Sequence, residues 1–295
     1  MSSIKDNILK INDLIQNLKN WYMVPLFKYG IVKKVAFITK RGDSMEINNM
    51  QDYYTFFSGR AWGMQKLGPV SERVKITDNM VILDGKTKFA YHKETELGAS
   101  LLMLGEVYKD EYGCLDVQDK LVIDVGANIG DSAIYFATKG AKKVIAFEPF
   151  PATYRQAKEN IYLNGMEKKI ELLNIGVGGK SETIFLPDTF IGTSGMDSIG
   201  KSALDENTDK GAPVRIVTLE EIIKMYPSSE TVLKMDCEGC EYASLLNATD
   251  DTLKHFSEII LEYHEKSGKL MEKFRKAGFT PELKYGRIML AKRNG

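Results

Sequence analysis

From about residue 119 to its end, the chain alternates short apolar runs with segments of helical periodicity. The apolar run KLVIDVG is followed by the helical segment DSAIYFATKG, and the run KKVIAFE is followed by PATYRQAKENIYLNG. Gly140 and Gly165 stand at the ends of these two helical segments, where glycine commonly ends a helix. Strands that alternate with helices in this way pair in parallel, and their helices cover both faces of the sheet. The pattern therefore predicts an α/β fold around a mostly parallel sheet.

The alternation continues to residue 293 with one interruption. A third apolar run, KIELLNIG, is followed by a polar stretch that interrupts the series over residues 178–213. Beyond it we expect helix, strand, helix, strand and helix in the segments TLEEIIKMY, TVLKMD, CEYASLLN, SEIILEYH and KLMEKFRKAGF. The last segment, TPELKYGRIMLAKR, predicts two strands joined around Tyr285 and Gly286, which would add an antiparallel strand. Residues 186–213 are too many for an ordinary connection, so we expect a lid over the substrate or a surface loop.

The first 110 residues lack this regular alternation. Apolar residues recur at roughly helical spacing from Ile4 to Leu18, which predicts an amphipathic helix to about residue 22. Short strands are expected in KKVAFITKRG, RVKIT, NMVILDG and KTKFAYHK, because turn residues separate these runs. We therefore predict two parts. Residues 1–110 form an N-terminal extension that would contact the substrate or a second copy in a homo-oligomer, and residues 111–295 form the main domain.

Charge and cysteine content narrow the classes of protein. Forty basic residues balance forty acidic ones, so no global field draws the chain toward nucleic acid or an anionic membrane. No segment approaches the roughly 18 consecutive apolar residues that a membrane-spanning helix needs. Three cysteines do not make a disulfide framework. We therefore expect reduced thiols and a cytoplasmic protein without a membrane span.

Polar residues follow each of five expected strands. In open parallel sheets, ligands bind outside the carboxyl ends of the strands, so these side chains are expected to line one crevice. They are Asp124, Glu148, Asn174, Asp236 and the group from Glu262 to His264.

The segment DVGANIGDS, residues 124–132, runs from a strand through two glycines into a helix. Gly126 would let the backbone turn tightly beside a ligand, and Gly130 would let the next helix pack closely. A dinucleotide fingerprint has a middle glycine that admits a pyrophosphate, but this chain has Ala127 and then Asn128 between the two glycines. The loop therefore favours a ligand without a pyrophosphate and disfavours a nicotinamide-dependent oxidoreductase.

Glu148 follows Gly126 by 22 residues and ends the second strand. An acid at this place can accept hydrogen bonds from both ribose hydroxyls, and Phe150 would lie against an adenine face. Taken singly, Gly126 can serve only to turn the chain, and Glu148 can serve only to cap the helix that starts at Pro151. Together, at this spacing, they favour a nucleoside-binding site.

Three segments resemble, in order and spacing, the signature blocks of the FkbM family of S-adenosylmethionine-dependent methyltransferases: VIDVGANIGDSAIYFATKGAKKVIAFEPFP, LKMDCEGCE and IILEYH. The resemblance covers about residues 105–290. It implies the class I methyltransferase fold, a seven-stranded sheet that ends in an antiparallel hairpin, with S-adenosylmethionine as cofactor. It also implies methylation of a hydroxyl on a sugar, a glycan or a small natural product, since the better-understood members are O-methyltransferases of such acceptors. Cofactor contacts are then expected from Asp124, Gly126, Ala127, Asn128, Gly130, Glu148, Pro149, Phe150, Asn174 and Asp236.

The cysteines of this motif have two interpretations. In the family pattern the fourth strand ends in Lys-x-Asp-x-Glu-Gly-x-Glu, which here is Lys234, Asp236, Glu238, Gly239 and Glu241. Cys237 and Cys240 occupy its variable positions. Nearby carboxylates oppose thiolate formation, and a structural zinc site usually needs four ligands. We therefore expect the two cysteines to be fillers, one of them against the core, rather than a thiol site.

The catalytic residues have two interpretations as well. His264 has the unperturbed pKa that suits a general base, while Asp236 would contact the methionine end of the cofactor or take the proton. Alternatively, Asp236, Glu238 and Glu262 would hold a divalent cation that lowers the pKa of the acceptor hydroxyl. The cation hypothesis rests on fold-level analogy, so the metal-free mechanism is preferred. Glu238 and Glu241 can also serve only as carboxylates at a helix N-terminus.

Two other functions stay open. The run AFEPFPATYRQAKENIYLNG also resembles a segment of some tRNA methyltransferases. However, residues 1–115 hold 16 basic against 13 acidic residues, and no Asn-Pro-Pro-Tyr motif follows the fourth strand, which disfavours a nucleic acid partner. A non-catalytic nucleoside-binding module is disfavoured by the acids and the histidine beyond the cofactor loop.

Overall fold

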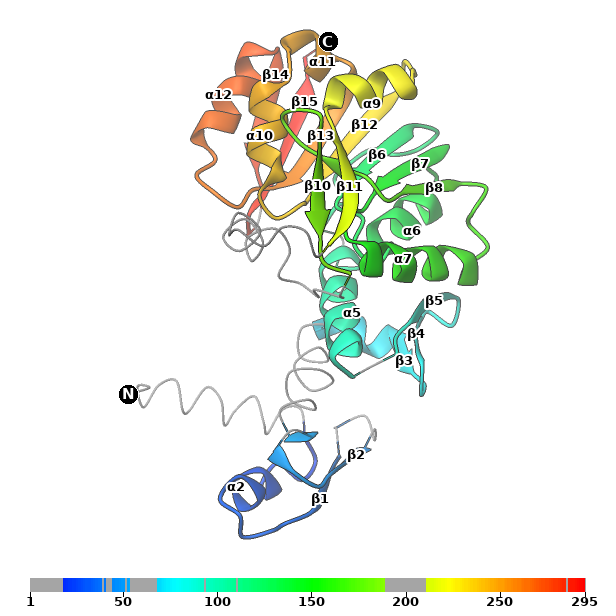
Figure 1. Ribbon diagram of the computed structural model, residues 1–295, viewed down its shortest axis with the longest axis vertical. Coiled ribbons are helices and arrows are strands. Elements are labelled where there is room, and N and C mark those ends of the chain that lie inside the picture. Colours follow the sequence, from blue (N-terminus) through cyan, green and yellow to red (C-terminus); the bar gives the residue numbers. More distant parts are fainter. Residues whose placement is uncertain are drawn as a thin grey trace. The chain divides into compact units, whose positions relative to one another are not determined.

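The chain forms two compact units, one of residues 1–86 and 91–109 and one of residues 87–90 and 110–295 (Figure 1). The computed structural model describes residues 18–38, 40, 44–50, 52–53, 68–92, 94–109, 111–188, 211–284 and 286–294. None of the helices in these ranges has the length and the apolar character needed to cross a bilayer.

In the first unit, two antiparallel strand pairs accompany short helices. Helix α2 (Met23–Lys28) and the pair β1 (Val35–Ile38) and β2 (Ser44–Ile47) enclose a small core that includes Phe27 and Phe37. After a 3-10 helix (Gly68–Arg73), β3 (Val74–Ile76) pairs with β4 (Met80–Leu83). The next strand in the chain, β5 (Thr87–Ala90), belongs to the second unit. Of the five strands β1 to β5, the sequence predicted all except β2. The helix expected up to residue 22 lies almost entirely outside the described residues.

Helix α5 (Glu94–Val107) was not expected. The segment contains Gly98 and Gly105, and glycine is one of the poorest helix formers. Leu97, Leu101 and Leu104 are nevertheless buried, since they recur on one face at helical spacing. Tertiary packing therefore overrides the local propensity here.

The second unit is built on the predicted sheet. Its seven strands lie in the order β14-β15-β13-β12-β6-β7-β8, and the pairs from β13 to β8 are parallel. β15 runs antiparallel to both of its neighbours, β13 and β14. The predicted α/β class, the mostly parallel seven-stranded sheet and its closing hairpin are confirmed. The strands are β6 (Leu121–Val125), β7 (Lys143–Phe147), β8 (Ile170–Leu173), β12 (Thr231–Met235), β13 (Phe256–Glu262), β14 (Phe279–Leu283) and β15 (Ile288–Arg293).

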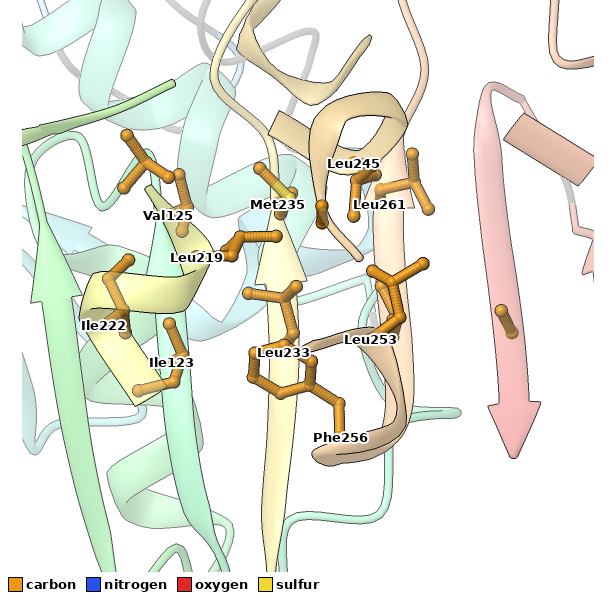
Figure 2. Packing of buried hydrophobic residues seen from close by; sticks show 14 of the residues in the cluster. Ile123, Val125, Leu219, Ile222, Leu233, Met235, Leu245, Leu253, Phe256 and Leu261 are labelled. Carbon is orange, nitrogen blue, oxygen red and sulfur yellow. The ribbon is translucent and has the colours of Figure 1, made fainter. Parts of the chain in front are cut away.

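Helices cover both faces of this sheet, because alternate strand residues point to opposite sides. On one face, Ile123, Leu233 and Leu261 meet Leu219 and Leu253 from the helices, as Figure 2 shows. The helices of this face are α9 (Leu219–Met225), α10 (Cys240–Asn247), α11 (Asp250–Lys254) and α12 (Gly268–Lys276). Two further helices, α6 (Asp131–Thr138) and α7 (Pro151–Leu163), contact β6, β7 and β8. They contribute no residue to the buried hydrophobic cluster of the first face, so they cover the other face.

The predicted interruption contains strands that the sequence did not reveal. β10 (Glu182–Leu186) pairs antiparallel with β11 (Ala212–Val217), which pairs in parallel with the short β9 (Gly176–Val177). Residues 189–210, the centre of the expected lid over 186–213, lie outside the described residues. The lid therefore stays a prediction.

Candidate active site

The loop after β6 has the tight geometry that its glycines predict. Gly126, Asn128 and Gly130 all have positive φ, at 78°, 46° and 83°. A Cβ at Gly126 would lie 1.8 Å from the backbone oxygen of Asp236, so no other residue fits there. The close neighbour of Gly126 is thus the end of β12, although the sequence suggested a ligand. Gly130 lets α6 begin close to Ala157 of α7.

Glu148, which directly follows β7, is hydrogen-bonded to this loop. Its two carboxylate oxygens accept hydrogen bonds from the backbone N–H groups of Asn128 and Phe150, each at 2.9 Å. Only 4% of Glu148 is exposed, and burial raises the pKa of its carboxyl to about 8 against these two hydrogen bonds. Phe150 is the N-cap residue of α7 and makes no capping bond with its own side chain, so the bond from its N–H to Glu148 is the contact of Glu148 with the start of this helix.

The other expected cofactor residues lie around Glu148. The amide nitrogen of Asn174 donates to the backbone oxygens of Glu148 and Pro149, so Asn174 fixes the path of the chain after β7. Phe150 is buried and packs with Leu186 of β10. Ala127 is buried within the loop.

A buried charge network lies beneath the cofactor loop. Lys234 and Asp124 are neighbours in the β12–β6 register, and the Lys234 ammonium lies 3.2 Å from the Asp124 carboxylate. Their side chains are 2% and 0% exposed. Lys234 also donates to the backbone oxygen of Gly126 at 2.8 Å, and Ser132 donates to Asp124 at 2.7 Å. Asp124 therefore anchors β6 to β12 and α6 from inside the protein.

Two pKa values in this network depart from their ordinary range. Burial disfavours the charged form of Lys234, but the carboxylates of Asp124, Asp236 and Asp131 raise its pKa, so Lys234 stays charged. Burial raises the pKa of Asp131, in the first turn of α6, to about 7 although Lys234 opposes this. The Lys234 side chain could in principle pair with Asp236, which follows it by two residues. It makes its direct ion pair with Asp124 instead.

Asp236 follows β12 at the same edge of the sheet. Its carboxylate accepts a hydrogen bond of 2.9 Å from the Tyr112 hydroxyl. Burial and then the charge of Asp236 raise the pKa of Tyr112 well above 10, so the hydroxyl remains a donor. The Lys234 ammonium lies 5.4 Å from the centroid of the Tyr112 ring. Tyr112 is a site residue that the sequence did not indicate.

Glu262 and His264 extend this edge at the end of β13. Burial, and then the nearby Asp236 carboxylate, raise the pKa of Glu262 to about 7. Burial favours the neutral ring of His264, but Glu241, Glu238 and Asp236 outweigh this and raise its pKa to about 9. The His264 nitrogens lie 3.3 Å from a carboxylate oxygen of Glu238 and 3.3 Å from one of Glu241. At neutral pH His264 is therefore an imidazolium between two carboxylates.

The expected cation ligands are brought together in a different combination. One ligand atom each from Asp236, Glu262 and His264 all lie within 4.8 Å of one another. Glu238, which was expected in this set, faces His264 instead. The imidazolium would have to lose its proton to bind a metal ion, so the geometry offers either a protonated histidine or a cation at this place.

The loop after β6, Glu148 and the polar residues that follow β12 and β13 lie at the carboxyl edge of the sheet, which is the edge of the predicted crevice. Three blocks of the sequence meet there. A family model described as the methyltransferase FkbM domain matches residues 124–281, which is more than half of the chain. The chain belongs to the FkbM methyltransferase family. The matched span begins at Asp124 in β6 and ends in β14, so it contains every residue of the crevice edge except Tyr112.

Relatives of this FkbM methyltransferase differ widely in length. AMB antimetabolite synthetase AmbE from Pseudomonas aeruginosa is 28% identical over 207 residues, which are 59% of this chain and 10% of AmbE. Methyltransferase sdnD from Sordaria araneosa is 23% identical over 214 residues, 61% of this chain and 81% of sdnD. Among solved structures, precorrin-6y C5,15-methyltransferase from Geobacter metallireducens is 15% identical, with a TM-score of 0.39, over 64% of this chain and 88% of its own.

Membership of the FkbM family makes S-adenosylmethionine the methyl donor, and the loop after β6 suits a polar ligand. The side-chain oxygen of Asn128 is buried and has no hydrogen-bond partner among the described residues. Each oxygen of Glu148 carries one backbone hydrogen bond, which leaves further lone pairs for donors such as ribose hydroxyls. Asn128 and Glu148 are thus the residues that could hold the nucleoside part of the donor.

The cysteines of this FkbM domain contradict one expectation. A disulfide joins Cys237 and Cys240, whose Cα atoms are 5.5 Å apart. The prediction of reduced fillers is wrong on the oxidation state, because three cysteines leave room for one pair, and a Cys-x-x-Cys turn brings its two sulfurs into reach. Cys240 is buried in the core cluster, as expected for one of the two. The inference of a cytoplasmic protein from reduced thiols loses its basis.

Proposed function

We propose that this methyltransferase transfers the methyl group of S-adenosylmethionine to a hydroxyl of a sugar, a glycan or a small natural product, with Glu262 as the base. The observation that carries the proposal is the cluster of Asp236, Glu262 and His264 beside the cofactor loop. A hydroxyl becomes a good nucleophile only as its proton leaves, and this cluster supplies a proton acceptor at the crevice edge.

Cofactor binding would use the loop after β6 and the chain after β7. S-adenosylmethionine supplies an electrophilic methyl group on a positively charged sulfur. In the proposal, Glu148 accepts hydrogen bonds from the ribose hydroxyls, while Asn128 offers its unpartnered side-chain oxygen. Asp124 and Asn174 act indirectly, because their hydrogen bonds hold the backbone that carries these groups. Phe150 is proposed to border the adenine.

Proton removal is assigned to Glu262 rather than to His264. A general base works best when its pKa lies near the operating pH, and the pKa of Glu262 is about 7. His264, with a pKa of about 9, is already protonated at neutral pH. Its positive charge lowers the pKa of Glu262 and thereby keeps a fraction of that carboxyl ionised. Tyr112 would orient Asp236 so that one of its oxygens faces the acceptor.

The class of acceptor is inferred from two kinds of support. The relative AmbE is named as an antimetabolite synthetase, which fits a natural-product acceptor. Equal numbers of acidic and basic residues give no surplus of positive charge for a polyanionic acceptor such as RNA.

The test has two stages. Calorimetry with S-adenosylhomocysteine, with NAD as the matched control, should show binding of the first and none of the second. The protein is then incubated with S-adenosylmethionine and panels of sugars, glycans and polyketide-type hydroxyl compounds, and mass spectrometry follows methylated products. Methylation of RNA, or of nitrogen atoms only, would contradict the proposal.

A further inference from the structure

The Cys237–Cys240 disulfide lies at the carboxyl end of β12, between Asp236 and the first turn of α10. It is part of neither the proposed proton transfer nor the proposed ribose contact. We propose that this pair is a redox modification site, opened by reagents of the dithiol class, and that opening it weakens the binding of S-adenosylmethionine. The second half of this proposal rests on the proposed function.

The disulfide loop packs directly against the cofactor loop. A Cβ built on Gly126 would lie 1.8 Å from the backbone oxygen of Asp236 and 3.2 Å from the Cα of Cys237. The Asp236 N–H donates to the backbone oxygen of Val125 at 3.0 Å. These contacts are between backbone atoms, which cannot give way as a flexible side chain can. A shift of residues 236–237 must therefore move the loop after β6 as well.

The disulfide loop contains a strained turn at Glu238, which can relax when the covalent bond is opened. Glu238 has a φ of 55°, in the left-handed region that residues other than glycine rarely adopt. The buried carboxylate of Glu241 accepts hydrogen bonds from the N–H groups of Cys237 (2.8 Å) and Gly239 (2.9 Å). The covalent bond and these two hydrogen bonds hold the turn. Without the covalent bond, Glu238 can relax toward negative φ and take Asp236 with it.

The bond is poorly placed to act as a general stabiliser. A disulfide restricts the unfolded chain less when the loop that it closes is shorter, and residues 237–240 form a very short loop. Its two sulfurs are also unequal. Cys237 is half-buried, whereas Cys240 is buried at the first position of α10, so a reagent in solution reaches the sulfur of Cys237 first.

The reaction follows from this inequality. A thiolate of the dithiol attacks the Sγ of Cys237, the S–S bond breaks, and Cys240 leaves as the thiolate and takes up a proton. The second thiolate of the reagent then attacks its own sulfur in the mixed disulfide and releases Cys237. The protein gains two electrons and two protons, and the dithiol becomes a cyclic disulfide. A small-molecule disulfide such as oxidised glutathione supplies the oxidant for the reverse reaction.

The surrounding charge predicts which thiols react faster. The carboxylates of Asp236, Glu238 and Glu241 lie within the same turn or next to it and outnumber the one imidazolium that faces them, His264, so this site repels anions. Cysteamine, which carries an ammonium group, should open the disulfide faster than mercaptoethanesulfonate, which carries a sulfonate. Added salt should reduce the difference.

The first measurement counts thiols and does not depend on the cofactor. The full chain is treated with oxidised glutathione, denatured without reductant, alkylated and weighed by mass spectrometry. We expect Cys237 and Cys240 to escape alkylation, while the exposed Cys114 is either alkylated or carries glutathione, and we expect three alkylated cysteines after dithiothreitol. Hydrogen exchange of residues 236–241 should accelerate on reduction in the Cys114→Ser variant and should not respond in the Cys237→Ser/Cys240→Ser variant. Three alkylated cysteines after the oxidant would overturn the proposal.

The second measurement addresses the cofactor. Calorimetry on the Cys114→Ser protein should show about tenfold weaker S-adenosylmethionine binding after reduction, within the range usual for coupled sites. The double cysteine variant should bind like the reduced protein in either buffer. Equal affinities of the oxidised and reduced forms would overturn the control of binding. If neither form binds S-adenosylmethionine, the proposed function fails, and so does the claim that the disulfide controls cofactor binding. The thiol count still tests whether the cysteine pair is a redox modification site.

Discussion

Replacement of Lys234 by methionine removes a buried ammonium and keeps a side chain of similar length. The lost partner lies 3.2 Å from Asp124, and both side chains are almost entirely inaccessible. Two unit charges at that separation attract each other by roughly 5 kcal/mol at an effective dielectric constant of about 20. The variant also loses the hydrogen bond to the Gly126 oxygen. Removal of one partner from a buried pair typically costs about 3–5 kcal/mol, and we expect Lys234→Met to destabilise the second unit by that amount at pH 8.

The loss should depend on pH in a defined direction. Lys234 lowers the pKa of Asp131, which is already raised to about 7 in the folded protein, mainly by burial. Without the ammonium the folded-state pKa rises further above the unfolded value, so the folded variant binds more protons than the unfolded chain. Such a group destabilises the fold as pH rises. The gap between the variant and the wild type should therefore be larger at pH 8 than at pH 5.

The assay must report on the second unit. Trp21 and Trp62 are the two tryptophans of the chain, and both precede residue 110, so their fluorescence is unsuitable. Hydrogen exchange of peptides from β6 and β12, measured across a urea series, gives the free energy of opening there. The Asp124→Asn/Lys234→Met variant removes both charges and should regain at least about half of the lost stability. A loss below about 1 kcal/mol that is the same at both pH values would refute the importance of the buried pair.

Four further predictions concern the crevice edge. Glu148→Ala should weaken S-adenosylmethionine binding by about 1–3 kcal/mol, because it leaves polar partners unsatisfied. The control variant Glu167→Ala, at an exposed position, should bind with unchanged affinity, and calorimetry on both folded variants measures the difference. Once an acceptor is known, the rate should rise with pH through about 7, the pKa of Glu262, and Glu262→Gln should cost about a hundredfold or more in turnover. In the same assay His264→Gln should move the midpoint to higher pH, since His264 lowers the pKa of Glu262; a midpoint near 9 in the wild type would instead assign the base to His264. Exhaustive chelation should leave the rate unchanged, and full loss of activity reversed by magnesium, calcium or manganese would contradict the metal-free mechanism.

The main sheet could be predicted because its strands are short, apolar and regularly spaced by helices. Two kinds of element were not predicted from the sequence. Helix α5 was hidden by Gly98 and Gly105, whose weak helix propensity is overcome by buried leucines. Strands β10 and β11 lie in a polar stretch and gain their stability from pairing with each other, a long-range contact that local composition does not encode.

The site divides in the same way. The loop after β6 was predictable, because its glycines are required by backbone geometry at that turn. Tyr112 was not, since it lies 124 residues from Asp236 and no local pattern links a lone tyrosine to a distant carboxylate. The disulfide was misjudged for a related reason. The carboxylates that disfavour a thiolate on Cys237 or Cys240 do not prevent the two sulfurs from being joined.

The polar residues at the strand ends all carry the same signal in the sequence, yet burial separates them into two roles. Asp124 is wholly buried, accepts a hydrogen bond from Ser132 and forms an ion pair with Lys234, so its carboxylate interacts with the protein rather than with a ligand. Glu262 and His264 are only partly buried, and their charges act on each other across the crevice edge. A buried carboxylate must find its partners within the fold, whereas a partly exposed one can exchange a proton with a ligand or with solvent. Between Asp124 on one side and Glu262 and His264 on the other, the difference between holding the site and acting in it therefore follows burial, which depends on contacts between distant segments and cannot be read from a strand-end motif.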